Sequence, residues 1–210
     1  MAKQLAFYFD ASACSNCKAC QIACQDTNAL PAEVRWRRVV QYGGGSWVPK
    51  GTVMVPNNVY TYSVSFACMH CEKPLCAEVC PTAAITKRAD GVVLIDKDLC
   101  IGCRYCQWAC PYGAPQFNEA AGVMTKCTFC QDLLAQGQNP ACVDACVMRC
   151  LTFGELDELR AKYGSENAVE PLPDANLTKP ALVITPHKFS QRSGRGTGKI
   201  LNMPEELQNS

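Results

Sequence analysis

The residues best suited to chemistry in this chain are its cysteines, which number 17 among 210 residues. Sixteen of them form four groups, each with a C-x2-C pair first and a C-x3-C pair after it, and Cys150 is the remainder. The interval between the two pairs is two residues in the first and third groups, four in the second and eleven in the fourth. The groups are Cys14, Cys17, Cys20 and Cys24; Cys68, Cys71, Cys76 and Cys80; Cys100, Cys103, Cys106 and Cys110; and Cys127, Cys130, Cys142 and Cys146.

This spacing suits a cube of four irons and four sulfides, which needs four thiolate ligands. A tight C-x2-C-x2-C loop wraps three thiolates around one cube, and the cysteine three residues further on points away and ligates a second cube. Pro81 and Pro111 follow the last cysteine of the second and third groups, where proline fixes the backbone and removes a hydrogen-bond donor. The pattern therefore predicts iron-sulfur clusters that exchange ligands in pairs.

Zinc and disulfides are the alternatives. Two C-x2-C pairs make a common structural zinc site, but zinc has no use for a third cysteine at the next step of two. An odd number of cysteines leaves one thiol unpaired, and cysteines three residues apart are poorly placed to pair with each other. Iron-sulfur clusters are favoured over both.

The elements that must position these loops are short. Residues 5–10, "LAFYFD", and 58–67, "NVYTYSVSFA", predict strands that enter the first and second groups, and residues 85–96 predict a hairpin that links the second group to the third. "GELDELRAKYG" predicts a helix that ends at Gly164. The tail from about residue 165 is rich in proline, glycine and polar residues, so we expect an extended arm with little to build a core.

Composition excludes several classes of protein. A net charge of +1 indicates no nucleic-acid partner, and no apolar run approaches the roughly 18 residues that span a bilayer. The first apolar run ends at Asp10 and is too short for a secretory signal, so we expect no signal of the chain's own. Membrane attachment would come through another protein.

Five stretches carry a resemblance to a known family: "FYFDASACSNCKACQIACQD", "CMHCEKPLCAEVCPTAAI", "IGCRYCQWACPYGAPQFN", "MTKCTFC" and "LPDANLTKPALVITP". Over nearly its whole length the chain resembles the iron-sulfur electron-transfer (B) subunits of dimethyl sulfoxide reductases. These belong to the four-cluster ferredoxin subunits of molybdopterin oxidoreductases.

The resemblance implies an α+β fold of two ferredoxin-like 2x(4Fe-4S) modules with pseudo-two-fold symmetry. Residues 1–30 plus 124–155 would form the module with the first and fourth groups, and 59–123 the module with the second and third. Residues 31–58 would be an insertion, and 156–210 a short helix and extended C-terminal tail.

The resemblance also implies the cluster pairing, which spacing alone does not settle. No residue would be catalytic. The sixteen cysteines of the four groups would bind the iron of four 4Fe-4S clusters. Cluster 1 would be held by Cys14, Cys17, Cys20 and Cys146; cluster 2 by Cys100, Cys103, Cys106 and Cys80; cluster 3 by Cys68, Cys71, Cys76 and Cys110; and cluster 4 by Cys127, Cys130, Cys142 and Cys24.

By the same resemblance the chain would be an electron-transfer subunit and no enzyme by itself. It would relay electrons between a membrane anchor that oxidises quinol and a molybdopterin catalytic subunit. These partners would hold it peripherally on the cell membrane, and the sequence does not indicate on which face. Two alternatives stay open: a free-standing polyferredoxin, and the equivalent subunit of an enzyme that reduces polysulfide, an N-oxide or an oxyanion.

The fourth group departs from the family, because Val147 stands where relatives usually have proline after the last cysteine. Cys142, Cys146 and Cys150 are spaced to line one side of a helix, and we expect that helix to run on past Cys146 by a residue or two. A slipped alternative makes Cys146 and Cys150 the C-x3-C pair and leaves Cys142 spare. We expect Cys150 to be a small buried thiol.

Other polar and aromatic residues invite a role near the clusters. His70 tunes a cluster, contacts a partner or bonds to backbone, and Arg104 raises a potential, binds the catalytic subunit or is simply solvated. The basic run at 35–40, "RWRRVV", predicts a solvated face. We expect packing roles for Trp36, Trp47 and Trp108.

Overall fold

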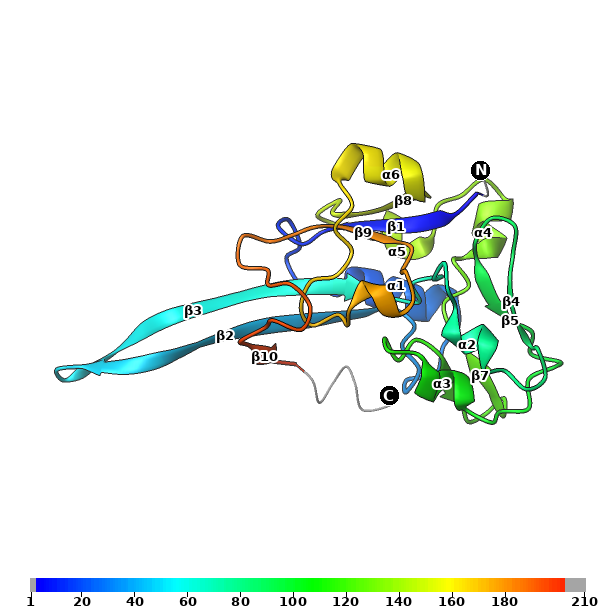
Figure 1. The fold of residues 1–210 in the computed structure, drawn as a ribbon, viewed down its shortest axis with the longest axis horizontal. Helices are drawn as coiled ribbons and strands as arrows, with labels where there is room; N and C mark the ends of the chain where they lie inside the picture. The colour runs from blue at the N-terminus through cyan, green and yellow to red at the C-terminus, as the bar shows by residue number, and fades with distance from the viewer. Residues whose placement is uncertain (1–2, 203–210) are drawn as a thin grey trace.

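The computed structural model describes residues 3–202 and has a mixed α/β architecture. At its centre is a three-stranded sheet in which β1 (Leu5–Asp10) lies between β8 (Leu151–Glu155) and β9 (Leu182–Thr185). β1 is antiparallel to β8 and parallel to β9 (Figure 1). The first strand thus pairs only with segments from the last third of the chain.

The continuous apolar run of β1 is explained by burial on both faces. Ala6 and Tyr8 face α6 (Leu156–Tyr163), and Tyr8 stacks on Tyr163 with ring centroids 3.7 Å apart. Phe7 and Phe9 face the main core, which contains most of the buried cysteines. Alternation along one strand therefore separates a small helix-covered cluster from the core that surrounds the thiols.

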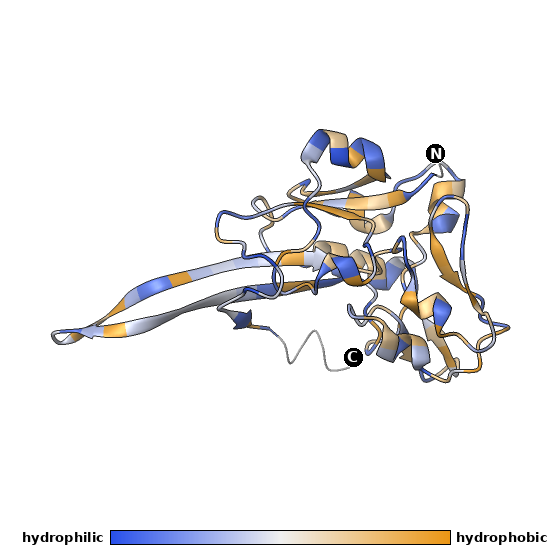
Figure 2. Cartoon of the chain, in the orientation of Figure 1, coloured by the Kyte–Doolittle hydropathy of each residue, from blue (hydrophilic) through white to orange (hydrophobic). Residues whose placement is uncertain are grey.

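A long antiparallel ribbon of β2 (Arg38–Lys50) and β3 (Val53–Phe66) projects from the body, with β10 (Lys199–Ile200) along its base (Figure 1). Near the body its side chains are buried, whereas its distal half is exposed and carries apolar segments on both strands (Figure 2). The register shifts between Gly44 and Ser46, where Gly45 has a φ of 101°, a conformation that favours glycine.

Two short hairpins and two short helices form the other end of the body (Figure 1). The hairpins are β4 (Ile85–Lys87) with β5 (Val93–Ile95), and β6 (Gln116–Asn118) with β7 (Val123–Thr125). Ile85, Val93 and Met124 form a small core there together with Cys106. The helices are α2 (Leu75–Glu78) and α3 (Tyr105–Ala109).

The remaining helices are short, and most lie next to cysteine loops. They are α1 (Ala19–Thr27), α4 (Gln131–Ala135), α5 (Ala141–Asp144) and the 3-10 turn η1 (Ala175–Leu177). Within the described residues, no helix has the length and apolar character needed to cross a membrane.

Several expected elements are confirmed. β1 occupies residues 5–10, the 85–96 segment is a hairpin whose turn contains Gly91 at a φ of 82°, and α6 is followed by Gly164 at a φ of 92°. The strand expected at 58–67 is longer, because β3 begins at Val53 within the expected insertion and pairs with β2 from there. The boundary expected at residue 58 therefore falls inside a strand.

Two expectations are wrong. The tail does contribute to a core, because residues 182–184 of β9 are fully or almost fully buried against β1. An apolar run of four residues is enough for an edge strand when the neighbouring strand already exists. The helix of the fourth group does not run past Cys146, since α5 ends at Asp144, so Cys142, Cys146 and Cys150 do not share a helix.

Candidate iron-sulfur centres

The cysteine groups share one local architecture. In each group the first cysteine of the C-x3-C pair lies in a short helix, and outside α1 the last cysteine follows the helix by one or two residues. The helical members are Cys20, Cys76, Cys106 and Cys142. A helix of four or five residues thus separates the last cysteine from its loop in three groups, whereas in the first group both cysteines lie in the nine-residue α1.

The backbone of the loops repeats as well. Asn16 and Lys18, two and four residues after Cys14, have φ values of 58° and 59°, and Gly102 and Arg104 have φ values of 69° and 65° at the equivalent positions after Cys100. Left-handed residues among right-handed ones turn successive N–H groups toward one side and make a concavity that binds anions. A sulfide-rich cluster is such an anion.

Amide groups also point at sulfur. The N–H of Phe129 donates to Sγ of Cys127 at 3.4 Å, the N–H of Met124 to Sγ of Cys100 at 3.4 Å, and the N–H of Ala114 to Sγ of Cys110 at 3.5 Å. Hydrogen bonds to a charged acceptor are the stronger kind, so these amides stabilise thiolates.

Two sets of thiols come together at the end of the body formed by α2 and α3. Burial raises the pKa of Cys76, and charges on Cys68, Cys110 and Cys71 raise it further. Burial likewise raises the pKa of Cys106 to about 11, with further increases from the nearby Cys100, Cys103 and Cys80. Each set combines three cysteines of one group with the last cysteine of the other.

A third set lies beneath the central sheet. Burial raises the pKa of Cys24 to about 12, with contributions from the nearby thiols of Cys142 and Cys130. Burial also raises the pKa of Cys127, which lies near Cys24 and Cys142. The last thiol of the first group is therefore among thiols of the fourth group.

The fourth set lines a small hollow beside β1. Five cysteines face this hollow, one more than a cube needs: Cys14, Cys17, Cys20, Cys146 and Cys150. The hydrogen bond from Cys150 lowers the pKa of Cys14 to about 7 and raises the pKa of Cys150. The Sγ atoms of Cys150 and Cys146 are 3.5 Å apart.

This placement bears on the slipped alternative, in which Cys142 would be spare. Cys142 lies near Cys130 and Cys24, whereas Cys146 lies beside Cys150 and the first group. The arrangement favours Cys142 and Cys146 as the C-x3-C pair, and it makes Cys150 a neighbour of two candidate ligands.

Sequence reasoning missed two buried cations. The solvated face expected at 35–40 is wrong for Arg37 and Arg38, because each side chain is only 2% exposed. Arg37 lies among the thiols of Cys142, Cys20, Cys127 and Cys24, and its Nε and Nη2 atoms are buried with no hydrogen-bond partner of ordinary geometry among residues 3–202. No sequence signal marks this pair, since charged runs are usually solvated.

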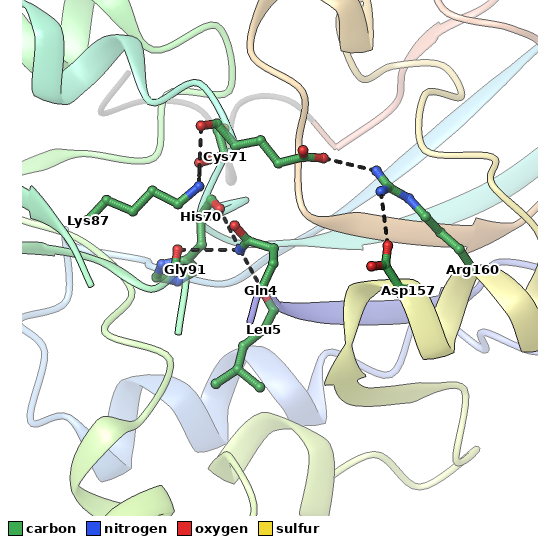
Figure 3. Close-up of polar contacts among 9 residues, drawn as sticks. Gln4, Leu5, His70, Cys71, Lys87, Gly91, Asp157 and Arg160 are labelled. Atoms are coloured by element: carbon green, nitrogen blue, oxygen red, sulfur yellow. Dashed lines mark hydrogen bonds and ion pairs between the residues drawn. The ribbon is translucent and has the colours of Figure 1, made fainter. Parts of the chain in front are cut away.

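His70 is one of the residues that hold the second loop in place. Its Nδ1 accepts a hydrogen bond from the N–H of Val93 at 3.0 Å, so the expected backbone role is confirmed. The side-chain amide of Gln4 donates to the carbonyls of His70 at 3.2 Å and Gly91 at 3.3 Å, and Lys87 donates to the carbonyl of Cys71 (Figure 3). The start of β1 is thereby joined to the second cysteine loop.

Two of the three tryptophans differ from expectation, and Arg104 has partners of its own. Arg104 forms an ion pair with Glu119 at 3.2 Å and covers the ring of Phe117, so its partners lie within the chain. Trp36 is buried as expected, but Trp47 is 61% exposed and Trp108 is 73% exposed, so the packing role is wrong for these two.

The donor set fits iron-sulfur clusters better than a single ion. Four sets of mostly buried or half-buried thiols, amide N–H groups aimed at sulfur and a buried guanidinium with no carboxylate partner in residues 3–202 suit an anionic, sulfur-rich group. In residues 3–202, no three side chains of His, Cys, Asp or Glu converge on one ion position.

Comparison with known proteins agrees with this chemistry. A family model described as a 4Fe-4S dicluster domain matches residues 59–156. The chain is 49% identical over 207 residues to the B subunit of anaerobic dimethyl sulfoxide reductase from Escherichia coli (strain K12), a match that covers 99% of this chain and 100% of the relative. It is 39% identical over 192 residues to the B subunit of polysulfide reductase from Wolinella succinogenes, a match that covers 90% of this chain and 97% of the relative. It is 38% identical over 175 residues to a formate dehydrogenase iron-sulfur subunit of the same species, a match that covers 73% of this chain and 82% of the relative.

Proposed function

The protein is a member of the family of dimethyl sulfoxide reductase B subunits, and from this premise we propose that it holds four 4Fe-4S clusters. We propose that these clusters transfer electrons between two partner subunits. It is a non-catalytic, iron-sulfur electron-transfer subunit of an oxidoreductase complex. We propose a molybdopterin catalytic subunit and a quinol-oxidising membrane anchor as the partners, which would hold the chain peripherally on the membrane. Dimethyl sulfoxide is the favoured terminal substrate.

The ligand sets are the sixteen cysteines in the pairing of first group with fourth and second with third. The observation that carries this proposal is that the last thiol of each group lies near thiols of its partner group: Cys80 with the third group, Cys110 with the second and Cys24 with the fourth. Cys146 lines the hollow of the first group. Spacing alone left this choice open.

The proposal includes two ferredoxin-like modules related by pseudo-symmetry. Support comes from backbone conformations that recur at equivalent positions, Asn16 with Gly102 and Lys18 with Arg104. Ala83 and Arg149, each three residues after the last cysteine of its group, share φ values of 54° and 51°. Such repetition is expected of two copies of one motif.

The clusters would form a line in the order 1, 4, 3, 2. The thiol of Cys20 lies near that of Cys142, which brings clusters 1 and 4 together, and the thiol of Cys127 lies near that of Cys68, which brings clusters 4 and 3 together. When bound, the clusters supply one-electron carriers whose potentials depend on charge, hydrogen bonds and solvent exposure. The chain's residues fix the spacing, exclude water and donate N–H groups to sulfur.

Exposed apolar side chains mark both ends of this line. Ile22, Val147 and Met148 are exposed beside the first and fourth groups. Ile101, Tyr105 and Trp108 are exposed beside the third. Apolar surface of this kind favours burial against another protein, so each end would dock one partner.

Anaerobic purification with iron, sulfide and molybdenum analysis tests the proposal. We expect a brown complex with about sixteen irons per chain, broad absorption near about 400 nm and a co-purifying molybdenum subunit. A colourless chain that holds zinc would overturn the iron-sulfur assignment, and iron well below sixteen would remove the count of four. A brown chain that purifies alone would favour a free polyferredoxin.

A further inference from the structure

Arg37 is a buried cation whose contacts are unusual for an arginine. Its side chain is 2% exposed, and its guanidinium carbon lies 4.6 Å from the centre of the Phe7 ring. Nη1 donates to Oγ of Ser65 at 3.3 Å, and that oxygen lies 3.4 Å from Sγ of Cys20. One edge of the guanidinium is therefore held next to a candidate ligand of cluster 1.

Arg37 has one further polar neighbour, the thiol of Cys142, because burial raises the pKa of Cys142 and a side-chain hydrogen bond with Arg37 lowers it in part. Nε and Nη2 of Arg37 have no hydrogen-bond partner of ordinary geometry in the described residues. Removing a guanidinium from water is strongly unfavourable unless a negative charge and hydrogen-bond acceptors replace the lost hydration. Something else at this position must supply both.

The surrounding groups are thiols. Arg37 interacts electrostatically with Cys142, Cys20, Cys127 and Cys24, in decreasing order. Cys20 belongs to the proposed ligand set of cluster 1, and the other three belong to that of cluster 4. The guanidinium thus lies where these two ligand sets meet.

We propose that Arg37 is a positioning residue for clusters 1 and 4, which donates its Nε–H and Nη2–H groups to their sulfurs and provides a shared counter-charge. This inference rests on the proposed function. A cube ligated by four thiolates carries about two negative charges, so it supplies the acceptors and the charge that Arg37 lacks. A fixed positive charge favours the more negative, reduced form, and Arg37 therefore raises the potentials of both clusters.

Arg38 provides a matched control. It is the next residue, is also 2% exposed and lies over the ring of Phe66. Its Nη2, however, donates to the backbone carbonyls of Tyr112 at 2.5 Å and Gly113 at 3.0 Å, and its charge partly offsets the burial that raises the pKa of Cys110, which belongs to the proposed ligand set of cluster 3. A charge lost at Arg38 tests for general damage to the fold at clusters 1 and 4, while a shift of cluster 3 is expected from its contact with Cys110.

The test is an EPR-monitored redox titration of the purified complex, with iron analysis of each sample. Arg37→Gln should retain iron and shift two of the four clusters to lower potential, whereas Arg38→Gln should leave those two unchanged and Arg37→Lys should recover part of the shift. Equal shifts of all clusters, or none, in an iron-replete Arg37→Gln variant would overturn the proposal.

A second pair of variants covers the case in which Arg37→Gln does not fold. Arg37→Lys keeps the charge but cannot reproduce the forked N–H geometry, so it alone should lower the same two potentials relative to Arg38→Lys. Identical potentials in these two variants would then overturn the proposal. Failure of the proposed function is seen separately, because the unmodified complex would itself lack iron.

Discussion

The Sγ atoms of Cys146 and Cys150 lie 3.5 Å apart at the end of the fourth cysteine group. Cys150 also contacts Cys14, and both neighbours belong to the ligand set proposed for cluster 1. The odd cysteine is therefore a thiol whose single S–H can donate to either of two ligand sulfurs, rather than an isolated core residue.

Cys150→Ala should leave the iron content of the complex unchanged, because the four proposed ligands of cluster 1 remain. The lost S–H donor should lower the potential of cluster 1 alone, since hydrogen bonds to ligand sulfur stabilise the reduced cluster. EPR-monitored titration of the variant measures this shift.

Cys146→Ala is the matched control and should remove about a quarter of the iron, if it is a ligand of one of four clusters. A Cys146→Ala variant with full iron, together with loss of a cluster from Cys150→Ala, would show that Cys150 is the ligand and would reverse the two roles.

Ile184 tests the contribution of β9 to the central sheet. Its side chain is fully buried (0% exposed) against the main core, so Ile184→Ala should lower the stability of the fold by about 2–5 kcal/mol. Leu177, in the same tail, is 52% exposed, and Leu177→Ala should change stability by less than about 0.5 kcal/mol. Thermal loss of visible absorption compares the two variants; equal losses would show that β9 is not part of the stable core.

The distal half of the β2–β3 ribbon should bind a partner subunit. Trp47 and Met54 are exposed there, and an isolated two-stranded ribbon with apolar side chains has little stability in water. Trp47→Ser with Met54→Ser should leave iron and thermal stability of the chain unchanged but reduce its recovery with the catalytic subunit. Asn57→Ser, a polar change on the same ribbon, should not reduce this recovery. A double variant that assembles normally with the catalytic subunit would contradict the proposed role.

Cluster assembly on the iron-free chain should depend on pH. Burial raises the pKa of Cys24 to about 12 and of Cys106 to about 11, above the value of about 8.5 for a free cysteine. These thiols therefore hold their protons at neutral pH and must release them when iron binds, so a higher pH favours binding. Cluster reconstitution, measured as absorption at about 400 nm, should be more complete at about pH 9 than at about pH 7 and should release protons to the solvent. A yield that does not change with pH would contradict this expectation.

Cysteine spacing predicted much of the site, because the local loop and helix geometry around each group depends on neighbours in the sequence. The C-x3-C cysteines do lie at short helices, and β1 and the 85–96 hairpin are where the sequence predicted them.

What the sequence did not reveal depends on distant partners. Arg37 and Arg38 look like a solvated run because charged residues are rarely buried, and the thiols near Arg37 are as far away in sequence as Cys142. The strand β9 was hidden in a proline-rich tail, because its pairing with β1 spans more than 170 residues.

The pairing of β1 with β8 and β9 has a consequence for biosynthesis. The first strand leaves the ribosome with both edges unpaired, and neither partner exists until residues 151–185 have been made. Exposed apolar strand edges promote aggregation during that interval. Residues 59–125, which contain the second and third cysteine groups and two hairpins, have by then been synthesised in full. The central sheet therefore cannot form until most of the chain has been synthesised, although it contains the first strand.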